Sequence, residues 1–288
     1  MILRNRTIRS LGQALLVMNL AIGVCLAQTA APAGGTYEIH PIRNVMVTAR
    51  DGVRLVTDVY LPAKAGAVDG RFPTIVERTP YNKDGNAAGL TAFFVPRGYA
   101  VVVQDVRGRY NSEGTWRPLR DDGPDGADLL KWIAAQHWSN GKVGTVGMSY
   151  GGATQHALAI ENAPALTAMV PVDAMSNAGR YGVRHNGAFE LRWLNWILTL
   201  GIATGKTASP TGLEKGRNGE AAAARAAHPK EAAPALIAMG DHIREYVRAL
   251  PLRPGTTPLQ FAPEYEQWLV EAMSHGDNDT FWTGMGAD

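Results

Sequence analysis

Gly147-Met148-Ser149-Tyr150-Gly151 lies between an apolar run at 143–147 and a segment with helical spacing. A serine on a tight turn from a strand to a helix is pushed outward, and glycines are needed there because a Cβ atom would clash with the neighbouring strand and helix. The backbone N–H of Tyr150 would then face the space where an acyl oxyanion develops. The pattern predicts a nucleophilic serine, and the alternative is a glycine-rich turn with an incidental serine.

The chain around this motif has the pattern of a sheet that begins antiparallel and continues parallel. Residues 45–49 and 54–61 flank Asp51-Gly52, a pair that tolerates the positive φ angles of a tight hairpin turn. The candidate strands after this hairpin are the apolar runs 73–77, 99–104, 143–147 and 168–172. Segments long enough for helices separate them, one of which is predicted at 125–136, and this alternation indicates parallel βαβ units. The predicted class is α/β, and a serine on a strand-to-helix turn is typical of the α/β-hydrolase fold.

The second half of the chain has a different character. From residue 186 to 282 alanine, leucine and tryptophan recur at helical spacing, and a Gly- and Pro-containing stretch at 207–219 interrupts them. This pattern favours a helical cap over further sheet. The predicted organisation has three parts, namely a signal peptide at 1–27, an α/β-hydrolase core at 37–180 and a helical cap region at 181–288. The strand at 168–172 would then leave an unpaired apolar edge.

The N-terminus has the layout of a secretory signal peptide. Three arginines precede an apolar run at 11–26, and small residues around Ala27 would allow cleavage there. We therefore expect a secreted or periplasmic protein without stable membrane association after cleavage. The alternatives are an N-terminal membrane anchor and a lipid attachment at Cys25, although Val24 stands where lipid attachment prefers a small residue.

Composition narrows the possible partners. The 28 basic and 26 acidic residues nearly cancel, and no basic run suggests a nucleic-acid partner. Cys25 is the single cysteine, so an internal disulfide is excluded. The sequence offers no close His/Asp/Glu cluster with metal-ligand spacing, and we predict neither a metal nor a cofactor. A small-molecule ester or amide substrate is the expected partner.

A second motif, Arg78-Thr79-Pro80-Tyr81-Asn82-Lys83, follows the candidate strand at 73–77. In hydrolases of this layout the loop after that strand supplies the other oxyanion donor, and the O–H of Tyr81 could do so. Taken alone, a tyrosine after a proline is more often a packing residue.

Five ordered motifs together resemble the cocaine esterase (CocE/NonD) family, which is related to α-amino-acid ester hydrolases and Xaa-Pro dipeptidyl peptidases. Besides the stretches at 78–83 and 147–152 they are Arg97-Gly98-Tyr99-Ala100-Val101-Val102, Gln104-Asp105-Val106-Arg107-Gly108 and Ser112-Glu113-Gly114. The resemblance implies that Ser149 is the nucleophile. It implies an oxyanion hole made by the Tyr81 hydroxyl and the Tyr150 backbone N–H. It also suggests that Arg107 and Glu113 pair to hold a loop beneath the site.

A serine needs a base, and in this fold the acid and then the histidine follow the nucleophile in the chain. We see no further strands to carry them, and the stretch from His275 to Trp282 resembles a family segment that precedes those strands. The expectation is that the chain stops before its catalytic acid and base, and that His275 is not the triad histidine. Asp173 is the alternative acid. The other histidines considered, and not expected to reach the serine, are His156, His185, His228 and His242.

The function predicted from these features is hydrolysis of an ester or amide through an acyl-enzyme at Ser149. An Xaa-Pro dipeptidyl peptidase or an acyltransferase would use the same serine turn and oxyanion hole. A secreted, non-catalytic protein that binds acyl-like ligands is the alternative outside the enzymes.

Overall fold

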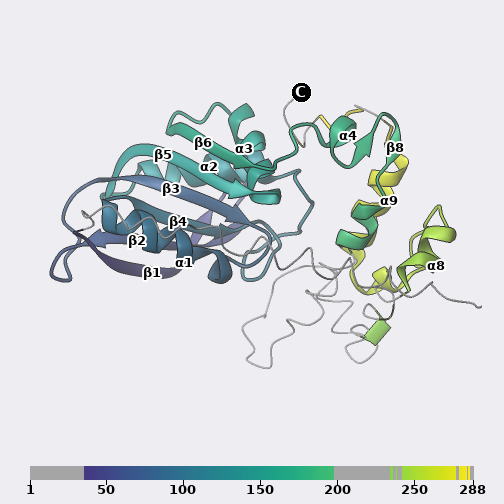
Figure 1. Cartoon of the computed structure of the whole chain (residues 1–288), viewed down its shortest axis with the longest axis horizontal. Helices are drawn as coiled ribbons and strands as arrows, with labels where there is room; N and C mark the ends of the chain where they lie inside the picture. The colour runs from purple at the N-terminus through teal and green to yellow at the C-terminus, as the bar shows by residue number, and fades with distance from the viewer. Residues whose placement is uncertain are drawn as a thin grey trace, which may run out of the picture. The chain divides into compact units, whose positions relative to one another are not determined.

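The computed structural model describes residues 36–197, 234–235, 238, 242–276, 279–283 and 285. Its centre is a six-stranded sheet in the order β1-β2-β4-β3-β5-β6 (Figure 1). The strands are β1 (Glu38–Thr48), β2 (Arg54–Ala63), β3 (Phe72–Thr79), β4 (Ala100–Asp105), β5 (Ser139–Met148) and β6 (Leu166–Val172). The helices of this part are α1 (Lys83–Phe94), a short 3-10 helix (Val95–Arg97), α2 (Asp122–Ala134) and α3 (Tyr150–Ile160).

The predicted N-terminal hairpin is confirmed. β1 and β2 pair antiparallel around the turn at Asp51-Gly52, where Gly52 has a φ of +87°. β2 also pairs antiparallel with β4, whereas β4, β3, β5 and β6 run parallel to one another. The sheet is therefore mostly parallel with an antiparallel start, as the alternation of strands and helices predicts.

Helices cover both faces of the sheet, and the alternation of side chains along β4 shows how. Ala100 and Val102 point into a core with Leu129, Leu130 and other residues of α2 and α3. Val101 and Val103 point to the opposite face, where α1 packs. Because β4 is buried on both faces, it is a continuous apolar run rather than an alternating one.

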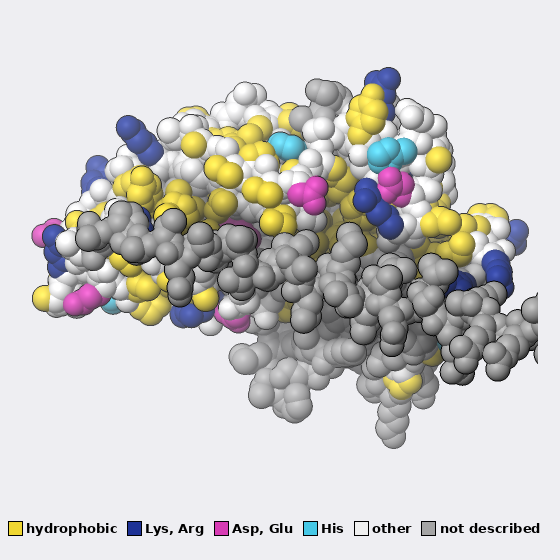
Figure 2. Space-filling view, in the orientation of Figure 1, with side chains coloured by type: hydrophobic (Ala, Val, Ile, Leu, Met, Phe, Trp, Pro, Cys, Tyr) yellow, Lys and Arg dark blue, Asp and Glu magenta, His cyan; other side chains and the backbone are white. Residues whose placement is uncertain are grey.

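β6 forms one edge of the sheet, as predicted. Within the described residues it pairs with β5 alone. Val170 and Val172 on this strand are 55% and 41% exposed. The space-filling view shows hydrophobic side chains gathered over the part of the surface that Figure 1 labels β5 and β6 (Figure 2).

The region after β6 is mainly helical in its described part. It contains α4 (Ala178–Tyr181), helical residues 192–197, α8 (Ile243–Arg248), a 3-10 helix (Pro258–Phe261) and α9 (Pro263–Ser274). The expectation that no strands follow β6 is wrong in one place, because β7 (Arg184–His185) and β8 (Ala188–Phe189) form a small antiparallel hairpin. Asn186 and Gly187 both have positive φ and make its two-residue turn.

Side chains of this helical region pack on the end of the sheet that carries Ser149. One buried cluster joins Trp116 and Tyr150 to Leu194, Tyr265 and Trp268. The described residues include no helix with the length and apolar character that a bilayer crossing requires. The stretch at 207–219 and the signal peptide at 1–27 lie outside the described residues, and the domain boundaries stay predictions.

Candidate active site

Ser149 occupies a strained turn between β5 and α3. Its φ of 56° and ψ of −117° lie in a region that residues other than glycine rarely adopt. Its N–H donates to the carbonyl of Val172 at 2.9 Å, and its carbonyl accepts from the N–H groups of Gly152 and Ala153. The residue is exposed, whereas Gly147 and Tyr150 are buried. The predicted arrangement of strand, sharp turn and helix is thus present.

The glycines around Ser149 differ in how much space a side chain would have at each position. A Cβ on Gly147 would lie 2.6 Å from the carbonyl oxygen of Gly151, so this glycine lets α3 begin directly against β5. A Cβ on Gly152 would lie 2.6 Å from the Cβ of Ala174. The prediction that Gly151 is equally constrained is wrong, because its nearest neighbour would be the Arg78 carbonyl at 3.4 Å.

Tyr81 lies just after β3, and it lines the same pocket as Ser149. Its backbone N–H donates to Thr79 Oγ1 at 3.0 Å, which fixes the turn after the strand. The Trp196 indole N–H donates to the phenol oxygen at 3.4 Å. Burial raises the pKa of Tyr81 above its usual value, although Trp196, Ser149 and nearby Arg109 oppose the rise. The phenol therefore keeps its proton at neutral pH and can donate it in a hydrogen bond.

Tyr150 contributes its backbone and its side chain in different ways. It is the first residue of α3, so its N–H belongs to the first turn, where donors lack a partner within the helix. Its side chain is buried, and its ring stacks on that of Trp196. The phenol donates to Asp122 Oδ2 at 2.6 Å and accepts from Trp116 Nε1 and the Leu119 N–H at 3.2 and 2.9 Å.

Asp122 lies at the centre of this buried network. Burial raises the pKa of its carboxyl to about 6, while the charge of Arg78, 3.5 Å away, and the Tyr150 hydrogen bond lower it. Nothing local to Asp122 in the sequence indicates that it anchors Tyr150, 28 residues further along.

The described residues around Ser149 enclose a pocket of about 540 Å³. Its walls combine aromatic rings with a few polar groups. They are formed by Tyr81, Ser149, Tyr150, Asp173, Ala174, Met175, Tyr181, Arg192, Trp193, Asn195 and Trp196. Trp193 and Trp196 belong to the stretch in which tryptophan recurs at helical spacing, but that spacing does not indicate that their rings face Ser149.

No histidine is among the described residues that line this pocket. His156 Nδ1 lies 3.2 Å from the Met175 carbonyl, in agreement with the expectation that it does not reach the serine. His185, His242 and His275 pair with Glu190, Glu245 and Asp279 at 2.6, 3.1 and 2.7 Å respectively. His228 lies outside the described residues. Across the described part of the chain, no group of three or more His, Cys, Asp or Glu side chains could hold a metal ion.

The expected pair between Arg107 and Glu113 is not formed. Arg107 instead binds Asp51 and Asp125 at 2.7 and 2.5 Å, and Glu113 pairs with Arg54. The loop between them is closed by its backbone, since the Gly108 N–H donates to the Glu113 carbonyl at 2.9 Å. Both side chains therefore hold this loop to other elements rather than to each other.

Comparison with known proteins places this geometry in context. A model of the family described as X-Pro dipeptidyl-peptidase (S15 family) matches residues 51–288. Cocaine esterase from Rhodococcus sp. (strain MB1 Bresler) is 34% identical over 264 residues, which are 87% of this chain and 41% of that protein. The chain thus spans less than half the length of this relative.

Two solved structures share the fold. A CocE/NonD family hydrolase from Staphylococcus aureus superposes with a TM-score of 0.51 at 29% identity, over 57% of this chain and 33% of its own. An α-amino acid ester hydrolase gives a TM-score of 0.54 at 24% identity, over 92% of this chain and 42% of its own. The resemblance inferred from the five sequence motifs is confirmed.

Proposed function

Because the chain belongs to the X-Pro dipeptidyl-peptidase (S15) family, we propose that it hydrolyses ester or amide bonds through an acyl-enzyme at Ser149. One observation carries the proposal, namely an exposed serine on a strained turn that lines a pocket together with Tyr81. Strain of this kind persists where the surrounding structure holds it, and it is concentrated at functional sites.

The proposed reaction proceeds in two steps. The Ser149 oxygen attacks the substrate carbonyl and its proton passes to a base, which gives a tetrahedral intermediate with a negative oxygen. The Tyr81 O–H and the Tyr150 N–H donate hydrogen bonds to this oxygen. The intermediate collapses as the leaving group departs with a proton. Water then attacks the acyl-enzyme, releases the acid and restores the serine.

We further propose that this chain by itself does not supply the base to Ser149. The support is that no described histidine lines the pocket, and that Asp173 offers only a carboxylate there. A fluorophosphonate probe should therefore label Ser149 slowly and incompletely in the purified chain. Fast, stoichiometric labelling would show that a base is present and would contradict this part of the proposal alone.

Acylation by an activated aryl ester tests the nucleophile and the oxyanion hole. Intact-mass analysis should find an acyl adduct on Ser149 that is absent from Ser149→Ala. Tyr81→Phe should slow its formation by about 10²–10³-fold, because one oxyanion donor is lost. Tyr99→Phe is the matched control, since Tyr99 packs on Phe94 outside the pocket, and should leave the rate unchanged. An adduct that forms elsewhere, or equally fast in Tyr81→Phe, would rule out the assignment.

A second candidate function is release of Xaa-Pro dipeptides, which the description of the matching family favours. The same serine and oxyanion donors would serve it, so the two activities differ only in substrate. Comparing turnover of an aryl ester with turnover of an Xaa-Pro anilide separates them.

We also propose that the core is 37–180 and the cap 181–288, and that the protein is secreted or periplasmic. In support of the division, Ser149, Tyr81 and Asp173 line the pocket from the core, whereas Arg192 and Trp196 line it from the cap. Acyl and leaving groups would then be selected mainly by cap side chains.

A further inference from the structure

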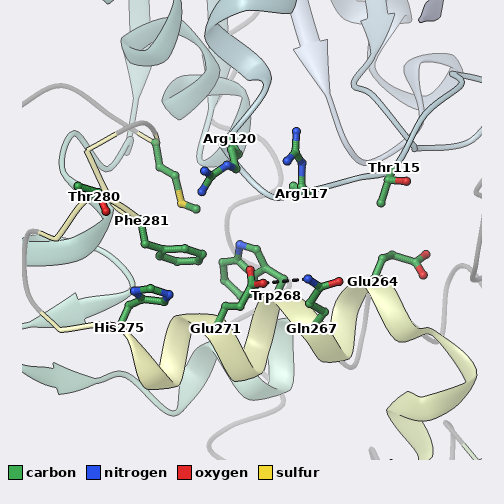
Figure 3. Close-up of a pocket in the computed structure, with 11 residues that line it drawn as sticks. Thr115, Arg117, Arg120, Glu264, Gln267, Trp268, Glu271, His275, Thr280 and Phe281 are labelled. Atoms are coloured by element: carbon green, nitrogen blue, oxygen red, sulfur yellow. Dashed lines mark hydrogen bonds between the residues drawn. The ribbon is translucent and has the colours of Figure 1, made fainter. Parts of the chain in front are cut away.

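A second pocket, of about 380 Å³, shares no lining residue with the one at Ser149. It lies between the loop that carries Arg117 and Arg120 and the helix α9 with the turn that follows it (Figure 3). Its size is within the range of small-molecule sites. Its labelled lining residues are Thr115, Arg117, Arg120, Glu264, Gln267, Trp268, Glu271, His275, Thr280 and Phe281.

Trp268 presents a buried donor to this pocket. The residue is 3% exposed, and its indole N–H has no hydrogen-bond partner among the described residues. In Figure 3 the indole nitrogen is directed from α9 toward the loop with Arg117 and Arg120. A buried donor without a partner costs free energy, which a ligand with an acceptor atom would recover.

Charges of both signs surround this N–H. Arg117 is held by Asp121 at 2.6 Å and points away from α9, whereas Arg120 extends toward the pocket. The Arg120 guanidinium lies over the Phe281 ring, with its Cζ atom 5.9 Å from the ring centroid. Glu271 lies one turn after Trp268 on α9 and accepts from Gln267 at 2.9 Å.

The floor of the pocket is aromatic. The rings of His275 and Phe281 are stacked with centroids 4.4 Å apart and an angle of 5° between planes. His275 Nδ1 also lies 2.7 Å from Asp279 Oδ2. Phe281 is 7% exposed and gives the pocket an apolar surface beside the charged residues.

From this arrangement we propose that the pocket is a second ligand site, for a zwitterionic α-amino acid with an apolar or aromatic side chain. The ligand carboxylate binds Arg120 and the Trp268 N–H, the ammonium group binds Glu271, and the side chain packs on Phe281. A ligand with a carboxylate alone would be repelled by Glu271, because it has no ammonium group to offset that charge. A ligand with an amine alone would be repelled by Arg120 and would leave the indole N–H unpaired.

Calorimetric titration in a Ser149→Ala background tests the charge requirement without hydrolysis. The first probe is L-phenylalanine, which carries both charges. The second is N-acetyl-L-phenylalanine, which carries only the negative charge, and the third is L-phenylalaninamide, which carries only the positive charge. L-phenylalanine should bind saturably, and each singly charged probe should bind about tenfold more weakly or worse. Absence of saturable binding, or equal binding of the three probes, would overturn the proposal.

Variants locate the site. Arg120→Met and Glu271→Gln, both at incompletely buried positions, should each weaken L-phenylalanine binding about tenfold. Trp268→Phe, which keeps a ring and removes the N–H, should also weaken it. Arg248→Met changes an exposed arginine outside the pocket and should have no effect. Binding that is lost in Arg192→Met but kept in Arg120→Met would place the ligand at Ser149 and refute the second site.

Discussion

At the scale of single residues, Asp105 shows how burial sets a pH dependence. It ends β4, is 1% exposed and accepts the Lys83 N–H at 2.7 Å. Burial raises the pKa of its carboxyl from 3.8 to about 7, although the hydrogen bond and the charge of Lys83 oppose the rise. Between these two pKa values the folded chain holds a proton that the unfolded chain releases. Its contribution to stability must therefore fall as the pH rises through this window.

Asp105→Asn isolates this effect, because an asparagine oxygen can still accept the Lys83 N–H but cannot ionise. The free energy of unfolding of the variant, relative to that of the parent, should rise between pH 4.5 and pH 8 by roughly 2–4 kcal/mol at most. Urea unfolding at the two pH values measures it. Asp69→Asn, at an exposed position, serves as the control. Parallel stability curves for Asp105→Asn and its parent would show that Asp105 is already ionised at the lower pH.

At the scale of elements, the contact of α3 with β6 depends on Gly152. Its substitution by alanine should lower the free energy of unfolding by about 1–3 kcal/mol, because the new Cβ would lie 2.6 Å from the Ala174 Cβ. Adding Ala174→Gly should restore part of the loss. Gly89→Ala on α1, where nothing lies within 4 Å, should instead stabilise the helix by about 1 kcal/mol. Equal effects of the two alanines would contradict this packing argument.

Element boundaries show where local sequence signals are sufficient. β4 and the turn at Asp51-Gly52 could be predicted because a short apolar run and an Asp-Gly pair each favour one structure. β5 begins at Ser139, earlier than its apolar run, because polar residues extend the strand without adding an apolar signal. The hairpin of β7 and β8 has an Asn-Gly turn but only two residues in each strand, which is too short for a recognisable alternation.

At the scale of the whole molecule, the candidate site divides into a predictable part and a part that depends on tertiary packing. Ser149 and Tyr81 follow buried strands in recognisable motifs, and parallel strands bring their carboxyl ends to one edge of the sheet. Trp196 reaches Tyr81 from 115 residues away. That contact depends on how the helical region after β6 packs on the sheet, which helical spacing alone does not determine.

At the same scale, we expect the exposed edge of β6 to affect how molecules of this protein associate. An edge strand with apolar side chains is a template for pairing with another chain. Val170 is 55% exposed on this strand, so Val170→Lys should reduce concentration-dependent association, measured by light scattering, with little change in the free energy of unfolding. Phe93→Lys removes a side chain that is 52% exposed on α1, away from any strand edge, and should reduce association less. If both variants reduced association equally, general surface hydrophobicity rather than the β6 edge would be the cause.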